Sequence, residues 1–516
     1  MSETQRTRHM PFAMILTRKS LADSIPLALI CLLPILLYLP FMSAPFERDE
    51  GVYATIADGM LKGQVPYRDL FDNKPPIVFV WYAIGFLLFG EQVAAPRIVA
   101  AALLSVTTLS LYAQVRMLFP RGVAYLAAAL FALSTGLPYV ALHANTEAYM
   151  LLPLMLSLLA FTTGIKTSRL RWFLVSGIFG GLAILTKQVA VWNLLALGGM
   201  ALWWSWRKSG GGWGALLPSL CLAGGSALAT AVVALPWAYS GGLGDFFYAT
   251  VAYNYKYVGM ISNAQRLFLL KRTVLFFLFF SAVAAPLVVG ALAGFLTLLR
   301  IRKPFGYYLL ITWALASAVG VATGGRFYPH YFLEITPVLA ILTAVVIYDR
   351  FRTRRFRPVP KVLLVAAALF VAISLTTSGL LYFAPDNTER TFSDDVYYQK
   401  EWEEASRQLG AYIAARTEPG DRIFNYGRES QVYFYAGRLP AAPYFYDWAY
   451  TYDENALAET IAVLRQQPPA YIIDSVQPPL YDLSERSPAF GQFLHERYEY
   501  VGRIYFADVY RLKRGE

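Results

Sequence analysis

Long apolar runs separated by short polar stretches are the dominant pattern of this chain. A helix that crosses a membrane needs about 20 apolar residues. Eleven runs meet or approach that length: 25–42, 94–118, 122–141, 148–165, 172–187, 188–206, 215–237, 273–299, 305–322, 330–349 and 361–383. A further run, 76–90, is only about 15 residues long, which suits an interfacial helix better than a crossing. The pattern predicts an α-helical polytopic membrane protein with about eleven spans.

Basic residues between the spans predict how the chain is oriented. If residues 76–90 do not cross, all the strongly basic connections fall on the same side as the basic N-terminus, as the positive-inside rule expects. The N-terminus is then cytoplasmic. The polar segments that remain share the outer face: the first outer loop 43–93, the turn 143–149, the loop 238–272 and the stretch 323–331.

The last quarter of the chain differs in kind, because charged residues return after residue 383. The stretch 398–421 has the periodicity of an amphipathic helix, and 422–427, 470–475 and 500–512 read as strands. We therefore expect two domains. Residues 1–383 form the transmembrane domain, and residues 384–516 form a small α/β domain on the outer, periplasmic side.

Composition agrees with a membrane protein. Hydrophobic residues make up 57% of the 516 residues and charged residues 15%, whereas about a quarter of the residues of a soluble domain are charged. The mean hydropathy is +0.43. The net charge of +11 would also suit a nucleic-acid-binding protein, but its position in short loops argues against nucleic acid as a partner. Both cysteines fall in apolar runs, so no disulfide framework is expected.

Several chemically capable side chains gather on the predicted outer face. Asp49 and Glu50 follow the first span, Lys74 precedes two prolines, and Arg326 and His330 stand at the entrance to a late span. Each has an ordinary explanation: acids favour a helix N-terminus, a flanking lysine extends its ammonium group towards water, and histidine is common at interfaces. Together they provide cations for a phosphate and an acid for a hydroxyl nucleophile.

An ordered set of segments makes the interpretation more specific. "RDEGVYATIADGML", "NKPPIVFVWYAIGFLLFG", "APRIVAALLS", "TEAYMLLPLMLSLLAF", "GIFGGLAILTKQ" and "RFYPHYFLEITPVLAIL" together resemble the membrane glycosyltransferases of the GT-C superfamily. The likeness covers most of residues 25–350. It is strongest to bacterial relatives of the protein O-mannosyltransferases and of the lipid A aminoarabinose transferase.

This resemblance implies a GT-C fold and an inverting transfer of a sugar from a polyprenyl-phosphate donor. The acceptor would be a hydroxyl of lipid A, another glycan, a glycolipid or a protein, at the outer face of a bacterial inner membrane. The implied residues, matched motif by motif, are Asp49 and Glu50 as the catalytic acidic pair, Lys74, Tyr53, Arg326 and His330 around the donor phosphate, Glu147 as the acid of the second outer loop, and Lys187 as a weaker contact.

Two positions depart from the aminoarabinose-transferase pattern. Asn73 and Val52 stand where that type has an acid and an arginine, which argues against that sugar and against a zinc site. No metal ligands are assigned, although a divalent cation is still possible.

Other functional classes share some of these features. A lipid or sugar transporter or flippase would also have many spans, but it is expected to carry ionisable residues near the middle of the bilayer and paired repeats. The spans here are largely free of charge. A polymerase or ligase of surface glycans would use the same donor chemistry.

Overall fold

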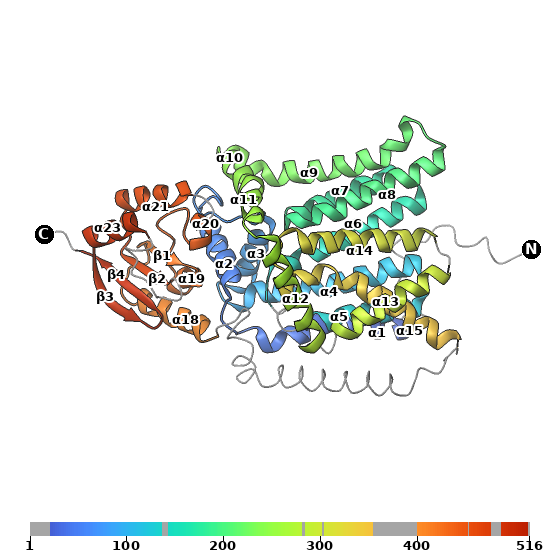
Figure 1. Ribbon diagram of the computed structural model, residues 1–516, viewed down its shortest axis with the longest axis horizontal. Coiled ribbons are helices and arrows are strands. Elements are labelled where there is room, and N and C mark those ends of the chain that lie inside the picture. Colours follow the sequence, from blue (N-terminus) through green and yellow to red (C-terminus); the bar gives the residue numbers. More distant parts are fainter. Residues whose placement is uncertain are drawn as a thin grey trace, which may run out of the picture.

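The computed structural model of this protein describes residues 21–136, 143–280, 284–301, 304–353, 400–451, 454–475 and 487–513. Figure 1 shows a long helical bundle with a smaller mixed α/β domain at one end. Helices α2 (Arg48–Leu61) and α3 (Ile77–Phe89) lie between the two.

The bundle confirms a mostly helical membrane protein. Six helical segments of the described chain are long and apolar enough to cross a membrane, and four more are apolar but shorter. The expected span 361–383 lies outside the described residues, as does the predicted domain boundary at 383. The bundle helices are α1 (Leu21–Tyr38), α4 (Ala94–Leu118), α5 (Arg121–Ser134), α6 (Thr146–Thr167), α7 (Leu170–Ile184), α8 (Val191–Ser209), α9 (Leu217–Tyr239), α13 (Ala284–Ile301), α14 (Pro304–Thr323) and α15 (Thr336–Thr353).

One predicted span, 273–299, is wrong in its bounds. The structure has two helices there, α12 (Asn263–Phe280) and α13, and α12 runs at a steep angle to α13 (Figure 1). The apolar residues 273–280 continue a helix that begins in the preceding polar loop and carries Arg266, Lys271 and Arg272. Hydrophobicity along the chain does not show where α12 ends and α13 begins, so the predicted span joined the two helices.

Helix α3 is too short to span a membrane. It has 13 residues, about 20 Å of helix, against a hydrocarbon core of about 30 Å. Gly90 ends it with a positive φ of 83°. The helix lies at the end of the bundle that faces the small domain (Figure 1), as expected for an interfacial helix in the first loop.

Close helix packing in the bundle depends on glycine. A Cβ atom added at Gly177 on α7 would stand 1.9 Å from the carbonyl oxygen of Leu222 on α9, and one added at Gly225 on α9 would stand 2.1 Å from the carbonyl oxygen of Leu174 on α7. The two backbones therefore touch directly. Small residues allow this approach in membranes, where dispersion contacts replace the hydrophobic effect between helices.

The C-terminal domain is built on one four-stranded sheet in the order β1-β2-β4-β3. β1 (Ile423–Gly427) and β2 (Tyr471–Ser475) pair in parallel, while β4 (Ala507–Leu512) is antiparallel to β2 and to β3 (Tyr498–Ile504). The first two predicted strands are confirmed. The third, 500–512, is wrong as a single strand: the chain turns at Tyr505, whose φ is 55°, and forms the hairpin β3–β4. The remaining helices are α18 (Lys400–Ala414), α19 (Gln431–Ala436), α20 (Asp447–Thr451), α21 (Glu454–Gln466) and α23 (Pro488–Arg497).

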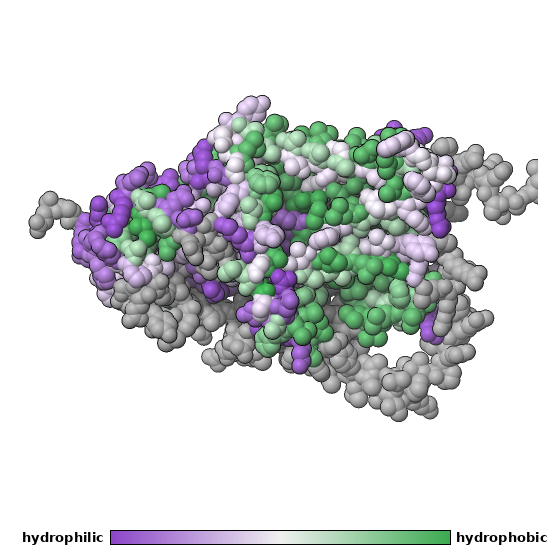
Figure 2. Space-filling model, turned by 45° about the horizontal axis from the view of Figure 1, so that its top comes forward, coloured by the Kyte–Doolittle hydropathy of each residue, from purple (hydrophilic) through white to green (hydrophobic). Residues whose placement is uncertain are grey.

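Hydropathy divides the surface along the long axis. Figure 2 shows hydrophilic side chains over the C-terminal domain and at the far end of the bundle, with a largely hydrophobic band between them. Such a band is what a lipid bilayer solvates.

Candidate functional site

The first turn of α2 carries a carboxylate that the protein leaves unengaged. The backbone N–H of Glu47 donates to the Glu50 carboxylate at 3.2 Å, which fixes the start of the helix. Asp49, between these residues, is partly exposed. Among the described residues, no hydrogen bond or ion pair involves its carboxylate.

Tyr53 follows Asp49 by one helical turn and points to the same side. Its side chain is buried, and its hydroxyl has no hydrogen-bond partner in the described part of the chain. Burial raises the pKa of Tyr53, and so do the negative charges of Asp49 and Asp72. The tyrosine hydroxyl therefore lies in an acidic, poorly hydrated region.

Glu50 is bound on all sides. Arg97, at the start of α4, donates from Nε to Oε1 at 2.9 Å and from Nη2 to Oε2 at 2.5 Å. The backbone N–H of Ala144 donates to Oε1 at 2.8 Å, and His143 Nδ1 lies 3.5 Å from Oε2. Both members of the Glu50–Arg97 pair are buried. This carboxylate has no free lone pair to direct at a substrate.

Lys74 is held at the end of the first loop by its neighbours. Its ammonium group donates to Asn73 Oδ1 at 3.1 Å, and its carbonyl oxygen accepts from the Tyr67 hydroxyl at 2.8 Å. Asn73 donates from Nδ2 to Asn254 Oδ1 at 3.1 Å, and its carbonyl accepts from Gln188 at 2.7 Å. The lysine is thus anchored to α11 (Tyr253–Gly259) and to the turn η5 (Gln188–Ala190).

Charge keeps Lys74 cationic. Burial by itself would lower the pKa of Lys74, but the carboxylates of Asp72, Asp49 and Glu147 outweigh it, and the pKa lies above its usual value. The negative charges of all three carboxylates act on the Lys74 ammonium group, although the acids come from different segments of the chain. A protonated lysine at this position attracts a phosphate.

Glu147, in the first turn of α6, is also engaged. Its Oε1 pairs with the ammonium group of Lys187, and its Oε2 accepts from Thr146 at 3.0 Å. Lys187 in turn stands 3.8 Å from the centre of the Tyr331 ring. His330 Nε2 lies 4.0 Å from Glu147 Oε1.

His330 is neutral at physiological pH. Burial lowers the pKa of His330 to about 4, and the Lys187 charge acts in the same direction, while Glu147 only partly opposes them. The imidazole therefore offers a hydrogen bond rather than a positive charge. The sequence predicted His330 near the donor phosphate but did not show that the ring is buried.

Arg326 packs against two neighbouring aromatic rings. Its guanidinium carbon is 4.3 Å from the ring centre of Tyr257 on α11 and 4.6 Å from that of Trp448 on α20. A guanidinium binds planar and tetrahedral oxyanions through its N–H groups, so Arg326 is a candidate for the phosphate contact. It lies in the loop before η8 (Pro329–Glu334).

The structure brings most of the predicted residues together at the end of the bundle that faces the C-terminal domain. Asp49, Tyr53, Lys74, Glu147 and His330 influence one another electrostatically. In the ranges that the structure describes, no group of three His, Cys, Asp or Glu side chains is arranged to hold a metal ion.

Sequence reasoning missed several residues of this region. Arg97 was detectable as a charge at the end of an otherwise apolar span, a position that marks a buried partner. Asp72 stands in the same polar stretch as Lys74. Tyr446 and Trp448 gave no signal, because they belong to a domain that lies hundreds of residues away in the sequence.

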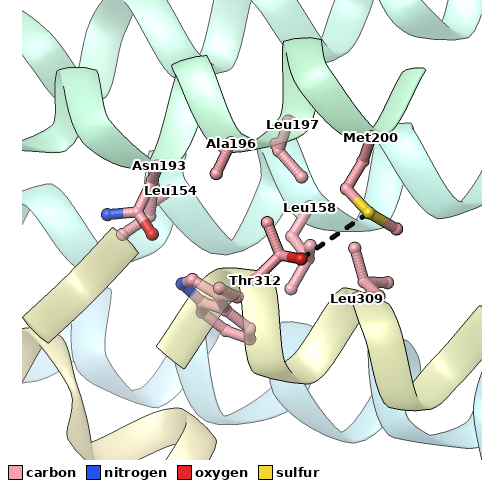
Figure 3. Close-up of a pocket in the computed structure, with 9 residues that line it drawn as sticks. Leu154, Leu158, Asn193, Ala196, Leu197, Met200, Leu309 and Thr312 are labelled. Carbon is pink, nitrogen blue, oxygen red and sulfur yellow. Dashed lines mark hydrogen bonds between the residues drawn. The ribbon is translucent and has the colours of Figure 1, made fainter. Parts of the chain in front are cut away.

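A separate hollow lies deeper in the bundle, between α6, α8 and α14 (Figure 3). Its volume is about 10 Å³, which leaves room for a single water molecule at most. Thr312 Oγ1 donates across it to Met200 Sδ at 3.6 Å. Its size excludes a sugar. The lining residues are Leu154, Leu158, Asn193, Ala196, Leu197, Met200, Leu309, Thr312 and Trp313.

Part of the chain matches a known protein family. Residues 73–237 match the family model described as dolichyl-phosphate-mannose-protein mannosyltransferase. The resemblance to the GT-C membrane glycosyltransferases is thereby confirmed. The matched part includes Lys74, Arg97, Glu147 and Lys187. A comparison with curated proteins found no match.

The fold of this chain is shared with solved structures. It is similar to ArnT from Cupriavidus metallidurans bound to undecaprenyl phosphate, with a TM-score of 0.61 and 15% identity over 95% of this chain and 98% of that one. The apo state of the same protein gives a TM-score of 0.58 at 15% identity over the same shares. The oligosaccharyltransferase AglB from Archaeoglobus fulgidus, in complex with an inhibitory peptide and a dolichol-phosphate, gives 0.50 and 14% over 89% of this chain and 70% of that one. At identities of 14–15%, these TM-scores show a shared fold.

Proposed function

We propose that this protein is an inverting glycosyltransferase that moves a sugar from a polyprenyl phosphate to a hydroxyl of an envelope acceptor. The observation that carries the proposal is the contrast among its acids. Glu50 and Glu147 are fully engaged by Arg97 and Lys187. Asp49 alone among these three is partly exposed and without a partner among the described contacts. A general base needs such a carboxylate.

The chemistry follows from this arrangement. The acceptor oxygen attacks the anomeric carbon as the bond from that carbon to the phosphate oxygen breaks. The acceptor's proton passes to Asp49, and the polyprenyl phosphate leaves with the electron pair. Lys74 and Arg326 stabilise the charge on the leaving phosphate. A single base suffices because a phosphate leaves without being protonated, so the configuration inverts.

Four other side chains assist the transfer: Glu50, Glu147, Tyr53 and His330. Glu50 fixes the first turn of α2 and so the position of Asp49. Glu147 and Lys187 neutralise each other beside the substrate, and His330 and Tyr53 offer hydrogen bonds to the sugar or phosphate.

The donor class rests on the relatives. ArnT was solved with undecaprenyl phosphate and AglB with a dolichol-phosphate, and the matched family is named for a dolichyl-phosphate sugar donor. The acceptor class stays open among lipid A, a glycan, a glycolipid and a protein. By the positive-inside rule, the basic connections favour a cytoplasmic N-terminus, with the site and the C-terminal domain on the periplasmic face of a bacterial inner membrane.

The deciding experiment is mass spectrometry of envelope lipids and glycans. Cells with the protein, without it, and with Asp49→Asn at equal expression are compared. We expect one sugar to be missing from one envelope component both in the deletion strain and with Asp49→Asn. That result would identify the sugar and the acceptor together.

The matched control is Asp58→Asn on the same helix, where the carboxylate pairs with Lys62 at 2.7 Å. This variant should retain the modification. A modification that persists with Asp49→Asn would remove Asp49 as the base. An unmodified lipid that accumulates on one side of the membrane, with no sugar missing, would indicate a transporter or flippase instead.

A further inference from the structure

A short segment of the C-terminal domain, residues 443–448, contacts both the first loop and Arg326. The backbone N–H of Phe71 donates to the carbonyl oxygen of Pro443 at 2.9 Å. The Tyr446 hydroxyl donates to Asp72 Oδ1 at 2.7 Å. The first loop is therefore joined to the C-terminal domain immediately before Lys74.

Asp72 is buried, and only one of its oxygens is engaged. Its Oδ2 atom has no hydrogen-bond partner among the described residues. An ionised, half-satisfied carboxylate in a poorly hydrated place is attracted to the nearest cation, and Lys74 is two residues away. The Tyr446 hydrogen bond holds this carboxylate in its present orientation, with the lysine ammonium on Asn73.

The same segment supports the second cation. Trp448 packs against the Arg326 guanidinium beside Tyr257, and the two ring centres are 5.8 Å apart. The Tyr253 hydroxyl donates to the Trp448 carbonyl oxygen, which ties this residue to α11. The guanidinium carbon of Arg428, in the C-terminal domain, lies 5.7 Å from the centre of the Trp448 ring. The indole is therefore fixed from both domains.

We propose that the C-terminal domain is a working part of the donor-phosphate site, with Tyr446 and Trp448 as its positioning residues. Tyr446 acts through Asp72 and keeps it from pairing with Lys74. Trp448 holds the Arg326 guanidinium in place beside Tyr257. The inference rests on the proposed function, because it takes Lys74 and Arg326 as the groups that bind phosphate. The donor-phosphate site is then incomplete without the C-terminal domain.

The test measures binding of undecaprenyl phosphate to the purified full-length protein in detergent, together with its melting temperature. Tyr446→Phe should weaken binding about fivefold, the equivalent of one hydrogen bond. Tyr446→Phe added to Asp72→Asn should have no further effect, because the carboxylate it restrains is gone. Trp448→Leu should weaken binding about fivefold, whereas Trp448→Phe, which keeps an aromatic face, should stay within about twofold of the wild type.

Tyr435→Phe is the matched control. Its hydroxyl accepts from the backbone N–H of Phe46 at 2.7 Å, so it joins the same two domains away from the cations. This variant should lower the melting temperature without changing affinity. Equal losses of affinity in Tyr435→Phe and Tyr446→Phe, or additive effects of Tyr446→Phe and Asp72→Asn, would overturn the inference.

The outcomes also separate the inference from the proposed function. If Lys74→Ala loses binding while Tyr446→Phe and Trp448→Leu do not, the inference alone is wrong. If the wild-type protein binds no undecaprenyl phosphate, the proposed function fails and the inference fails with it.

Discussion

Arg97 donates two hydrogen bonds to the carboxylate of Glu50, and neither side chain reaches solvent. The same guanidinium donates to the carbonyl oxygens of Phe41, Ala44 and Pro45. One arginine thus joins the end of the first span, the first loop and the start of α4. This pair supports the scaffold on which Asp49 is presented.

Loss of this pair should therefore affect folding before chemistry. We expect Arg97→Met to destabilise the protein by about 3–5 kcal/mol, because it leaves the buried Glu50 charge uncompensated. Asp49→Asn, one residue from Glu50, should melt like the wild type. Melting temperature and size-exclusion profile in detergent measure both. An Arg97→Met protein of normal stability and low activity would instead place this pair in the chemistry.

Lys74 should govern the affinity for the donor. Removing one charged partner of a phosphate costs about 1.5–3 kcal/mol, so Lys74→Ala should raise the KM for a polyprenyl-phosphate sugar by roughly 10- to 100-fold. Lys62→Ala is the control, since Lys62 is exposed and pairs with Asp58 in the same loop. Equal KM values for Lys74→Ala and the wild type would remove Lys74 from the phosphate site.

Loss of the Tyr53 hydroxyl should affect activity without lowering stability. Its hydroxyl is buried without a partner among the described residues, and an unsatisfied polar group contributes nothing favourable to the folded state. Tyr53→Phe should therefore melt at or above the wild-type temperature. If the substrate supplies the missing partner, kcat/KM falls about tenfold. A clear drop in melting temperature would show that the hydroxyl is already satisfied in the free protein.

His330 should make the fold sensitive to mild acid. Its pKa is about 4 in the folded protein against 6.5 for an unperturbed histidine. Below pH 6.5 the unfolded chain gains a proton that the folded protein does not, so stability falls as pH drops from about 6.5 to about 4. At pH 5 this amounts to about 2 kcal/mol.

His330→Gln should reduce the difference in melting temperature between pH 7 and pH 5. Donor affinity in the wild type should not rise over the same interval, because the imidazole stays neutral. Tighter binding at pH 5 that His330→Gln abolishes would show that the histidine is charged in the complex.

Much of the architecture could be predicted from local pattern. A bilayer has no water to satisfy backbone groups, so spans must be long, apolar and helical, and such runs are visible in one dimension. The stretches 422–427 and 470–475, which read as strands, likewise predicted β1 and β2. The exception is α12. Apolar composition could not reveal that this helix begins in a polar loop, or that it ends before α13 begins.

The sequence by itself determined the class of the fold and the set of chemically capable residues, because hydrophobic length, charge placement and an ordered series of motifs are local properties. Only the tertiary structure decided which carboxylate is available. Glu50 and Asp49 are neighbours in the chain. Of these two carboxylates, Arg97, 47 residues beyond Glu50, binds that of Glu50. Tyr446 meets Asp72 across 374 residues. Hydrogen bonds and ion pairs depend on distance in space, and no local pattern records that distance.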